Sequence, residues 1–260
     1  MENTNKPENH GLPWARDELI LAFDLYCRIP FKKTKANNPG VIELAGVLKR
    51  TSASIARKLG NFGSFDPELS KRKISGLPHA SRMDKEIWDA FHQNWNQLVL
   101  EAKQIKRRFR DAGKAVDFSE NLERPEGPGE REVIRKARVH QSFFRDAILS
   151  SYDGTCCITG LKIRQCLVAS HIIPWSQDER HRTDPRNGLC LSATFDRLFE
   201  SGLMTISKKL TIQISTELKN DSDPKTLKMI SCFHGRPIFP PHRFLPSETF
   251  LEWHRRHVFR

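Results

Sequence analysis

The chain has 260 residues, enough for two modest domains that each bury a core, and its formal net charge is +12. It has no signal peptide and no apolar run of 18 residues, and its six cysteines follow no disulfide pattern. These features argue against a membrane or disulfide-stapled protein and predict a cytoplasmic one. The charge predicts nucleic acid as the partner; the alternative is a solvated basic face without a specific partner.

The first part of the chain, residues 1–118, is predicted to be a helical domain. Residues 14–26 begin with an aromatic residue and an acidic first turn and then carry an apolar stripe, which indicates a helix packed on a core. Residues 41–62 form two short amphipathic segments joined by Lys-Arg-Thr-Ser, a pattern typical of a helix-turn-helix. A plain helical core without DNA contact is the alternative, because such patterns are short and degenerate.

The second of these segments and a basic run after it are predicted to contact DNA. The candidate residues are Arg50, Ser52, Arg57, Lys58, Lys71, Arg72 and Lys73. Lysine and arginine side chains on such a surface would bind phosphate groups of the DNA backbone. For the last three residues a solvated charge run is an equally good interpretation.

A linker is predicted at residues 119–130, which contain two prolines and two glycines and few apolar side chains. Residues 131–260 would then form a second domain, with its core at residues 138–206. The apolar positions of residues 140–152 recur at helical spacing, which predicts a helix leading into this core.

The core itself is predicted to contain two strands followed by a helix. Residues 167–173 are an apolar run stopped by Pro174, which indicates a buried strand that carries His171 at its far end. After a long polar loop, residues 187–191 read as a turn and a second short strand. Ser192 resembles a helix N-cap, and apolar residues at helical spacing follow it as far as Gly202. Asp196 would project from the first two turns of this helix.

These residues resemble the HNH endonucleases, over roughly Arg138 to Ile206. The resemblance rests on the patterns CxITG, A-S-H-I-x-P-W, D-x-x-N-G-L and F-D-x-L-F-x-x-G-L as they stand here. It is nearest to a restriction-endonuclease-like branch with an N-terminal helical DNA-reading domain. It implies a ββα-metal fold, in which a hairpin packs on one helix. The expected fold class is therefore α+β, with a helix-turn-helix-like domain before the nuclease domain.

The resemblance also implies a role for three residues. In that family the histidine of the first strand activates water as a general base, and the asparagine orients the active-site loop and the histidine. The residue nine positions after the asparagine ligates a divalent metal ion, and here this residue is Asp196, nine after Asn187. The chemistry agrees, because a neutral imidazole accepts a proton near pH 7 and a carboxylate suits Mg²⁺ or Mn²⁺.

Two departures from the family pattern affect the expected metal sites. Many HNH enzymes have Asp or His before the catalytic histidine as a second ligand, where this chain has Ser170. The metal would then be held by Asp196, substrate phosphate and water, with Ser170 or Asp184 as further candidates. No Cys-x-x-Cys pair is present, so no structural zinc is expected, and Cys156, Cys157, Cys166 and Cys190 are interpreted as small core residues.

The leading functional hypothesis is a metal-dependent endonuclease for double-stranded DNA, of the restriction type, with modification-dependent targeting slightly favoured. The loop between the strands, with Arg180 and Arg182, is a further candidate for DNA contact. A homodimer would supply two active sites. One alternative is a DNA-binding regulator with a degenerate nuclease fold, for which Ser170 is the main argument. The other is a nonspecific nuclease or RNA-cleaving toxin, which would need no front domain.

Overall fold

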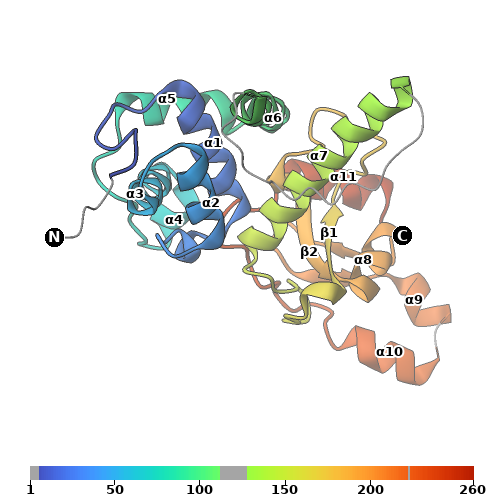
Figure 1. Cartoon of the computed structure of the whole chain (residues 1–260). Coiled ribbons are helices and arrows are strands. Elements are labelled where there is room, and N and C mark those ends of the chain that lie inside the picture. The colour runs from blue at the N-terminus through green and yellow to red at the C-terminus, as the bar shows by residue number, and fades with distance from the viewer. Residues whose placement is uncertain (1–5, 112–127, 222) are drawn as a thin grey trace. The chain divides into compact units, whose positions relative to one another are not determined.

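The protein is described by a computed structural model that covers residues 6–111, 128–221 and 223–260 (Figure 1). The chain divides into two compact units, Met1–Asp146 and Ala147–Arg260. Among the described residues, the first unit is helical and the second combines helices with two small sheets, so the α+β class is confirmed. Most of the predicted linker, residues 119–127, lies outside the described residues, and residues 128–130 already belong to a helix.

The first unit is built from helices whose ends agree with their capping residues. In chain order they are α1 (Arg16–Arg28), α2 (Pro39–Val47), α3 (Ser52–Gly63), α4 (Pro67–Lys71), α5 (Arg82–Phe91), α6 (Trp95–Asp111) and the first part of α7 (Pro128–Ser151). Asn38 caps α2 by accepting a hydrogen bond from the Gly40 amide, and Thr51 caps α3 by accepting one from Ser54. The two segments interpreted as a helix-turn-helix are thus two separate helices, α2 and α3, which contact each other.

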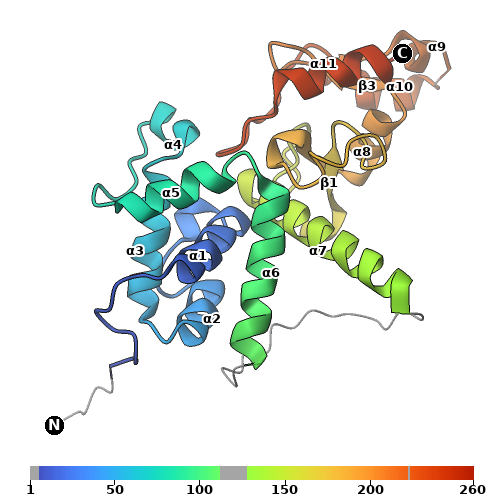
Figure 2. The same cartoon turned by 90° about the horizontal axis from the view of Figure 1, so that it is seen from above.

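Helix α1 lies at the centre of the first unit. It contacts α2, α3, α5 and α6, and Figure 2 shows it among these helices. Its Phe23 ring stacks or tilts against four other aromatic rings, those of Tyr26, Phe62, Trp88 and Trp95. Edge-to-face and offset contacts of this kind add to the hydrophobic gain of burial. The predicted apolar stripe therefore forms the core of the unit.

Two basic side chains predicted to contact DNA are buried in this core instead. Both oxygens of the Glu18 carboxylate accept hydrogen bonds from the Arg50 guanidinium, at 2.8 and 2.9 Å, and Arg50 also donates to three backbone carbonyl groups. The Lys58 ammonium pairs with Asp84 at 2.9 Å. Arg50 and Lys58 are only 5% and 7% exposed. The prediction that they bind phosphate is corrected, because each is enclosed and already paired with a carboxylate.

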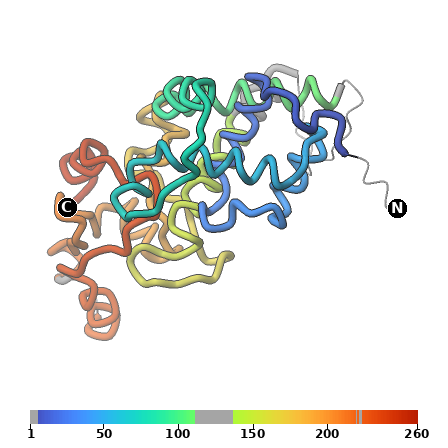
Figure 3. Tube along the Cα trace, turned by 90° about the vertical axis from the view of Figure 1, so that its left-hand side faces the viewer, coloured from blue at the N-terminus to red at the C-terminus, as the bar shows by residue number. Residues whose placement is uncertain are grey.

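The second unit contains two short hairpins and the helices that cover them. Its elements are the end of α7, η2 (Arg164–Cys166), β1 (Leu167–His171), η3 (Pro185–Asn187), β2 (Gly188–Ser192), α8 (Ala193–Glu200), β3 (Met204–Ile206), β4 (Ile212–Ile214), α9 (Thr216–Asp221), α10 (Pro224–Ser231) and α11 (Glu248–His257). Figure 3 follows the chain through this unit in yellow to red. Among the described residues, no helix is both long enough and apolar enough to cross a membrane.

Strands β1 and β2 and helix α8 form the predicted strand-strand-helix arrangement. The strands pair antiparallel, with Leu167 opposite Ser192 and His171 opposite Gly188, and α8 contacts both strands. The apolar face of α8, with Phe195, Leu198 and Phe199, is buried. The helix ends before Gly202, where φ is +77° and where a Cβ atom would lie 2.0 Å from the Val258 carbonyl oxygen. Glycine is required at this position by both constraints.

The C-terminal helix α11 is attached to this arrangement by a buried histidine. The ring of His254 stacks on that of Phe199, with centroids 3.7 Å apart, and its Nε2 donates to the Phe199 carbonyl oxygen at 3.0 Å. Its Nδ1 accepts from the Thr205 hydroxyl on β3 at 2.9 Å. Burial lowers the pKa of His254 to about 4, with the charge of Arg255 acting in the same direction. The ring is therefore held in its neutral form.

The cysteines are divided between the core and the surface. Cys156, Cys157 and Cys190 are fully buried, as expected for small core residues. The Cys156 sulfur accepts a hydrogen bond from the Ser192 amide at 3.2 Å, next to the start of α8. Cys166 is exposed, which corrects its assignment to the core. It lies in the short turn η2 and lines a pocket, and the local sequence gave no indication of its exposure.

The buried ring of His254 should make the stability of the second unit depend on pH. The unfolded chain takes up a proton as pH falls below the ordinary pKa of 6.5, whereas the folded ring does so only near pH 4. The contribution of His254 to the free energy of unfolding is therefore complete above pH 6.5. By pH 4 this contribution falls by roughly 3 kcal/mol at most. His254→Gln should be less stable than the wild type at pH 7 but lose less stability over this window, as measured by urea unfolding. Equal pH dependence of the two proteins would contradict the assignment.

The buried Arg50–Glu18 pair should be needed for the stability of the first unit. Arg50→Ala leaves the Glu18 carboxylate buried without its partner and should lower the free energy of unfolding by about 3–5 kcal/mol. Arg57→Ala, a matched change at an exposed position of α3, should change it by less than about 0.5 kcal/mol. Thermal unfolding of the three proteins measures the difference. Equal midpoints for the two variants would show that Arg50 has no such structural role.

Candidate active site

His171 lies at the end of β1, at the mouth of the long loop between β1 and β2. Its Nε2 is 2.9 Å from the backbone carbonyl oxygen of Arg182. A carbonyl oxygen only accepts hydrogen bonds, so Nε2 must carry the ring proton in this contact. The basic lone pair is then on Nδ1. Contact with the loop thus selects one tautomer of the ring.

The surroundings of His171 favour its neutral form. Burial lowers the pKa of the ring below 6.5, and the positive charge of Arg182 lowers it further. The Arg182 carbonyl has the opposite effect, because it stabilises a protonated Nε2, but the pKa remains below its ordinary value. At neutral pH the imidazole is therefore uncharged and able to accept a proton.

Asn187 holds the two ends of the loop together. Its Oδ1 accepts a hydrogen bond from the Ile173 amide at 2.8 Å, and its Nδ2 donates to the carbonyl oxygens of Ile173 and His181 at 3.2 and 3.3 Å. The residue is fully buried. His181 directly precedes Arg182, whose carbonyl group contacts His171. The Asn187 amide thus fixes the segment that orients the histidine.

Arg182, Trp175 and His171 each contact the other two. The Arg182 Nε donates to the Trp175 carbonyl oxygen at 2.9 Å, and its guanidinium carbon lies 5.0 Å from the centre of the Trp175 ring. The Trp175 ring in turn meets the His171 ring edge to face, with centroids 5.5 Å apart. The Arg182 side chain is therefore engaged within the loop, whereas Arg180, the other predicted DNA contact here, is exposed.

Trp175 and Arg186 are two residues of this site whose roles were not predicted. Trp175 is part of the pattern A-S-H-I-x-P-W, so the sequence contained a signal for it. Arg186 binds Asp184: its Nε and Nη2 donate to the carboxylate at 3.0 and 2.7 Å, and its amide also donates to it. Because the Asp184 carboxylate is occupied in this way, it is a poor candidate for a metal ligand.

Ser170 and Asp196, the two predicted metal ligands, each have a buried oxygen that lacks a hydrogen-bond partner. These atoms are the Ser170 Oγ and the Asp196 Oδ1, both without a partner among the described residues. Ser170 lies on β1 beside His171, and Asp196 lies on α8, which contacts β1. A buried oxygen without a donor is unfavourable unless something else occupies it. Two oxygen atoms of these types fit a hard divalent cation.

Clusters of stronger ligands are absent from the part of the chain that the structure describes. Nowhere in residues 6–111, 128–221 and 223–260 do three His, Cys, Asp or Glu side chains gather in a way that would hold a metal ion. A metal at Asp196 would therefore need ligands from outside this group, such as the Ser170 hydroxyl, water and a phosphate oxygen. This requirement is consistent with an ion that is bound together with its substrate.

The other predicted DNA contacts lie on the first unit. Arg57 is exposed on α3, and Ser52 is half-buried at the start of the same helix. Lys71, Arg72 and Lys73 are exposed at the end of α4, where Lys71 also pairs with Glu68. With Arg50 and Lys58 buried, the exposed charge of this region is carried by Arg57 and by residues 71–73.

Comparison with known proteins agrees with this description of the second unit. Residues 156–207 match the sequence profile of a family described as HNH endonuclease. The match includes β1, β2, α8 and β3, and with them His171, Asn187 and Asp196. No curated protein matches the chain. The matched domain supports nuclease activity, and with it DNA as the substrate.

Proposed function

We propose that the protein is a metal-dependent endonuclease that hydrolyses phosphodiester bonds in double-stranded DNA, with His171 as the general base. The observation that carries the proposal is the contact between the His171 Nε2 and the Arg182 carbonyl group. It leaves the basic lone pair on Nδ1 of a neutral ring. This base belongs to the region that matches the HNH endonuclease family.

In the reaction the His171 Nδ1 takes a proton from the attacking water molecule. The water oxygen bonds to phosphorus as the bond between phosphorus and the leaving oxygen breaks. The Arg182 carbonyl group, which accepts the hydrogen bond from Nε2, stabilises the protonated ring. Asp196 and Ser170 would hold Mg²⁺ or Mn²⁺, which supplies charge stabilisation of the phosphate group and the leaving oxygen. Their unpartnered oxygens are the support for this assignment.

Three other residues position the base. Asn187 fixes the backbone on both sides of the loop, and the Arg182 side chain holds Trp175 against the His171 ring. A ring held on one edge by a carbonyl group and on another by an aromatic neighbour cannot turn freely. Such preorganisation keeps the Nδ1 lone pair directed at one place.

We further propose that the first unit selects the DNA and the second cuts it. Exposed basic residues on α3 and after α4, namely Arg57, Lys71, Arg72 and Lys73, support a DNA surface there, and Arg180 would contact DNA beside the active site. The proposal includes a restriction-type role, with modification-dependent targeting favoured, because a compact HNH nuclease with an added reader fits that group. We also propose that the protein forms a homodimer, which would cut both strands of the DNA. A cytoplasmic location is proposed as well, and six free cysteines support it.

Loss of the base is the direct test of the proposed activity. His171→Ala should lower the rate of plasmid cutting in Mg²⁺ by roughly 10²-fold or more, the usual effect of removing a general base. DNA affinity should stay nearly unchanged, because the ring lies at the reacting atoms and not on the backbone-binding surface. His257→Ala, at an exposed position of α11, is the control. A folded His171→Ala protein that cuts at the wild-type rate would refute the proposal.

Loss of the carboxylate of Asp196 should affect activity and metal dependence together. Asp196→Asn replaces an anionic ligand by a neutral amide, which binds hard cations less well. Higher Mg²⁺ or Mn²⁺ concentrations should be needed for half-maximal cutting, and the maximal rate should fall. The control is Glu200→Gln on the same helix, where the carboxylate is exposed and paired with Arg197. If the metal titration of Asp196→Asn is the same as that of the wild type, Asp196 is not a metal ligand.

Removal of exposed charge from the first unit should weaken DNA binding without loss of stability. In a His171→Ala background, Arg57→Gln combined with Lys73→Gln should lower the slope of log K against log salt by about one for each lost phosphate contact. Arg82→Gln is the control, because its side chain is 94% exposed on another helix of the unit. Equal salt slopes for all three proteins would show that DNA is bound by another surface.

A further inference from the structure

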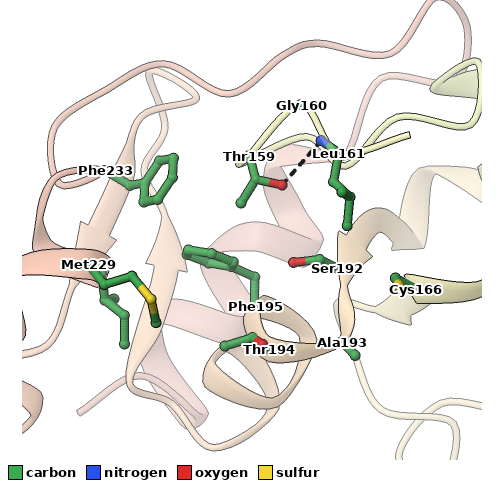
Figure 4. Close-up of a pocket in the computed structure, with 11 residues that line it drawn as sticks. Thr159, Gly160, Leu161, Cys166, Ser192, Ala193, Thr194, Phe195, Met229 and Phe233 are labelled. Atoms are coloured by element: carbon green, nitrogen blue, oxygen red, sulfur yellow. Dashed lines mark hydrogen bonds between the residues drawn. The ribbon is translucent and has the colours of Figure 1, made fainter. Parts of the chain in front are cut away.

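A pocket lies at the start of helix α8 in the second unit, near the end of β1 opposite to His171. Its volume is about 610 Å³, and its lining includes Phe195, Phe233, Leu161 and Met229 (Figure 4). The rings of Phe195 and Phe233 meet edge to face, with centroids 5.1 Å apart. Pockets of this size and apolar character are typical of sites for small organic groups. None of these side chains has a role in the proposed cutting reaction.

One end of the pocket is polar and is formed by the start of α8. Ser192 is the N-cap residue and is only 9% exposed, yet its hydroxyl makes no capping bond and has no partner in the part of the chain that is described. In Figure 4 this oxygen points into the pocket. The first amide groups of α8 also lack acceptors within the helix. A hydroxyl and helix amides together are suited to bind a phosphate group.

Three basic residues are close to the pocket lining in sequence or in space. Lys162 follows the lining residue Leu161, Lys228 precedes Met229, and the guanidinium of Arg236 lies 5.9 Å from the centre of the Phe233 ring. All three side chains are exposed, and none forms an ion pair with another described residue. Apolar side chains are exposed here as well, since Met229 is 62% exposed and Phe239, next to Gly160, is 55% exposed. The pocket therefore offers aromatic walls, donors at one end and the Arg236 cation beside Phe233.

We propose that this pocket binds a nucleotide whose base is out of the DNA stack, with the base against Phe233 and the phosphate at Ser192 and the start of α8. The identification as part of a DNA substrate rests on the proposed function. Stacking of a base on an aromatic side chain offsets much of the cost of taking the base out of the DNA stack. Because β1 spans roughly 16 Å between the pocket and His171, a single DNA molecule can reach both.

The methionines of the chain provide a direct test. The four methionines include Met229 in the pocket, exposed Met83 in the first unit and buried Met204 in the second. With methyl-labelled methionine in the full His171→Ala chain, deoxyadenosine monophosphate should shift the Met229 signal in a saturable way. The signals of Met83 and Met204 should not move, and they also report that each variant is folded.

Two variants and two smaller probes separate the base from the phosphate. Phe233→Ala should raise the half-saturating nucleotide concentration at least about fivefold, through loss of stacking. Ser192→Ala should weaken binding of the nucleotide more than binding of deoxyadenosine, which has no phosphate. Deoxyribose 5-phosphate, which has no base, should shift Met229 little. An equal response to the nucleotide and to deoxyribose 5-phosphate would overturn the proposal.

The source of the nucleotide is tested with DNA. A duplex with one bulged adenine should shift Met229 at lower concentration than the free nucleotide if the base comes from DNA; a response to the free nucleotide alone assigns the pocket to a free ligand of the same chemistry. No shift with any nucleotide, or a shift only with a peptide of alternating Glu and Leu, would overturn the proposal. Plasmid cutting by the wild-type protein is measured separately, so that failure of the endonuclease proposal and failure of the pocket assignment are distinguishable.

Discussion

The geometry of the β1–β2 hairpin depends on one buried amide, the side chain of Asn187. The loop between β1 and β2 is long and polar, and its backbone groups near the strands are enclosed by the protein. Buried backbone groups must be hydrogen-bonded, and Asn187 satisfies those of Ile173 and His181 with a single uncharged side chain. A carboxylate could not replace it, because Asn187 both accepts and donates. The carbonyl group of Arg182 is placed against His171 as a consequence.

Positive charge serves two different purposes in this chain. In the first unit, Arg50 and Lys58 are enclosed with Glu18 and Asp84, and each pair joins segments that are distant in sequence. Buried pairs of this kind contribute little net stability, but loss of one partner leaves a charge stranded. Other basic side chains, among them Arg57 and Lys73, are exposed. Each buried pair is neutral as a whole, so the net charge of +12 is carried by the rest of the chain.

Helix α8 makes three different contacts from two of its faces although it has only eight residues. Asp196 presents an unpartnered carboxylate oxygen, Phe195 forms a wall of the adjacent pocket, and Phe199 supports His254 of α11 through its ring and its carbonyl group. Consecutive helical residues point about 100° apart, so neighbouring positions can serve separate surfaces. The position of the C-terminal helix and the position of the Asp196 carboxylate are thus linked through one short element.

The sequence by itself determined the local elements of the second unit and the spacing of its site. The apolar run before Pro174, the N-cap at Ser192 and the glycine at 202 are local signals, and they define β1 and α8 because strand and helix ends depend on neighbouring residues. Only the tertiary structure decided which basic side chains are buried and paired and which are exposed. Arg50 and Glu18 are 32 residues apart, and Arg182 meets Trp175 and His171 across a loop. Such contacts, like the exposure of Cys166, depend on which distant segments pack together. Local sequence patterns therefore do not predict them.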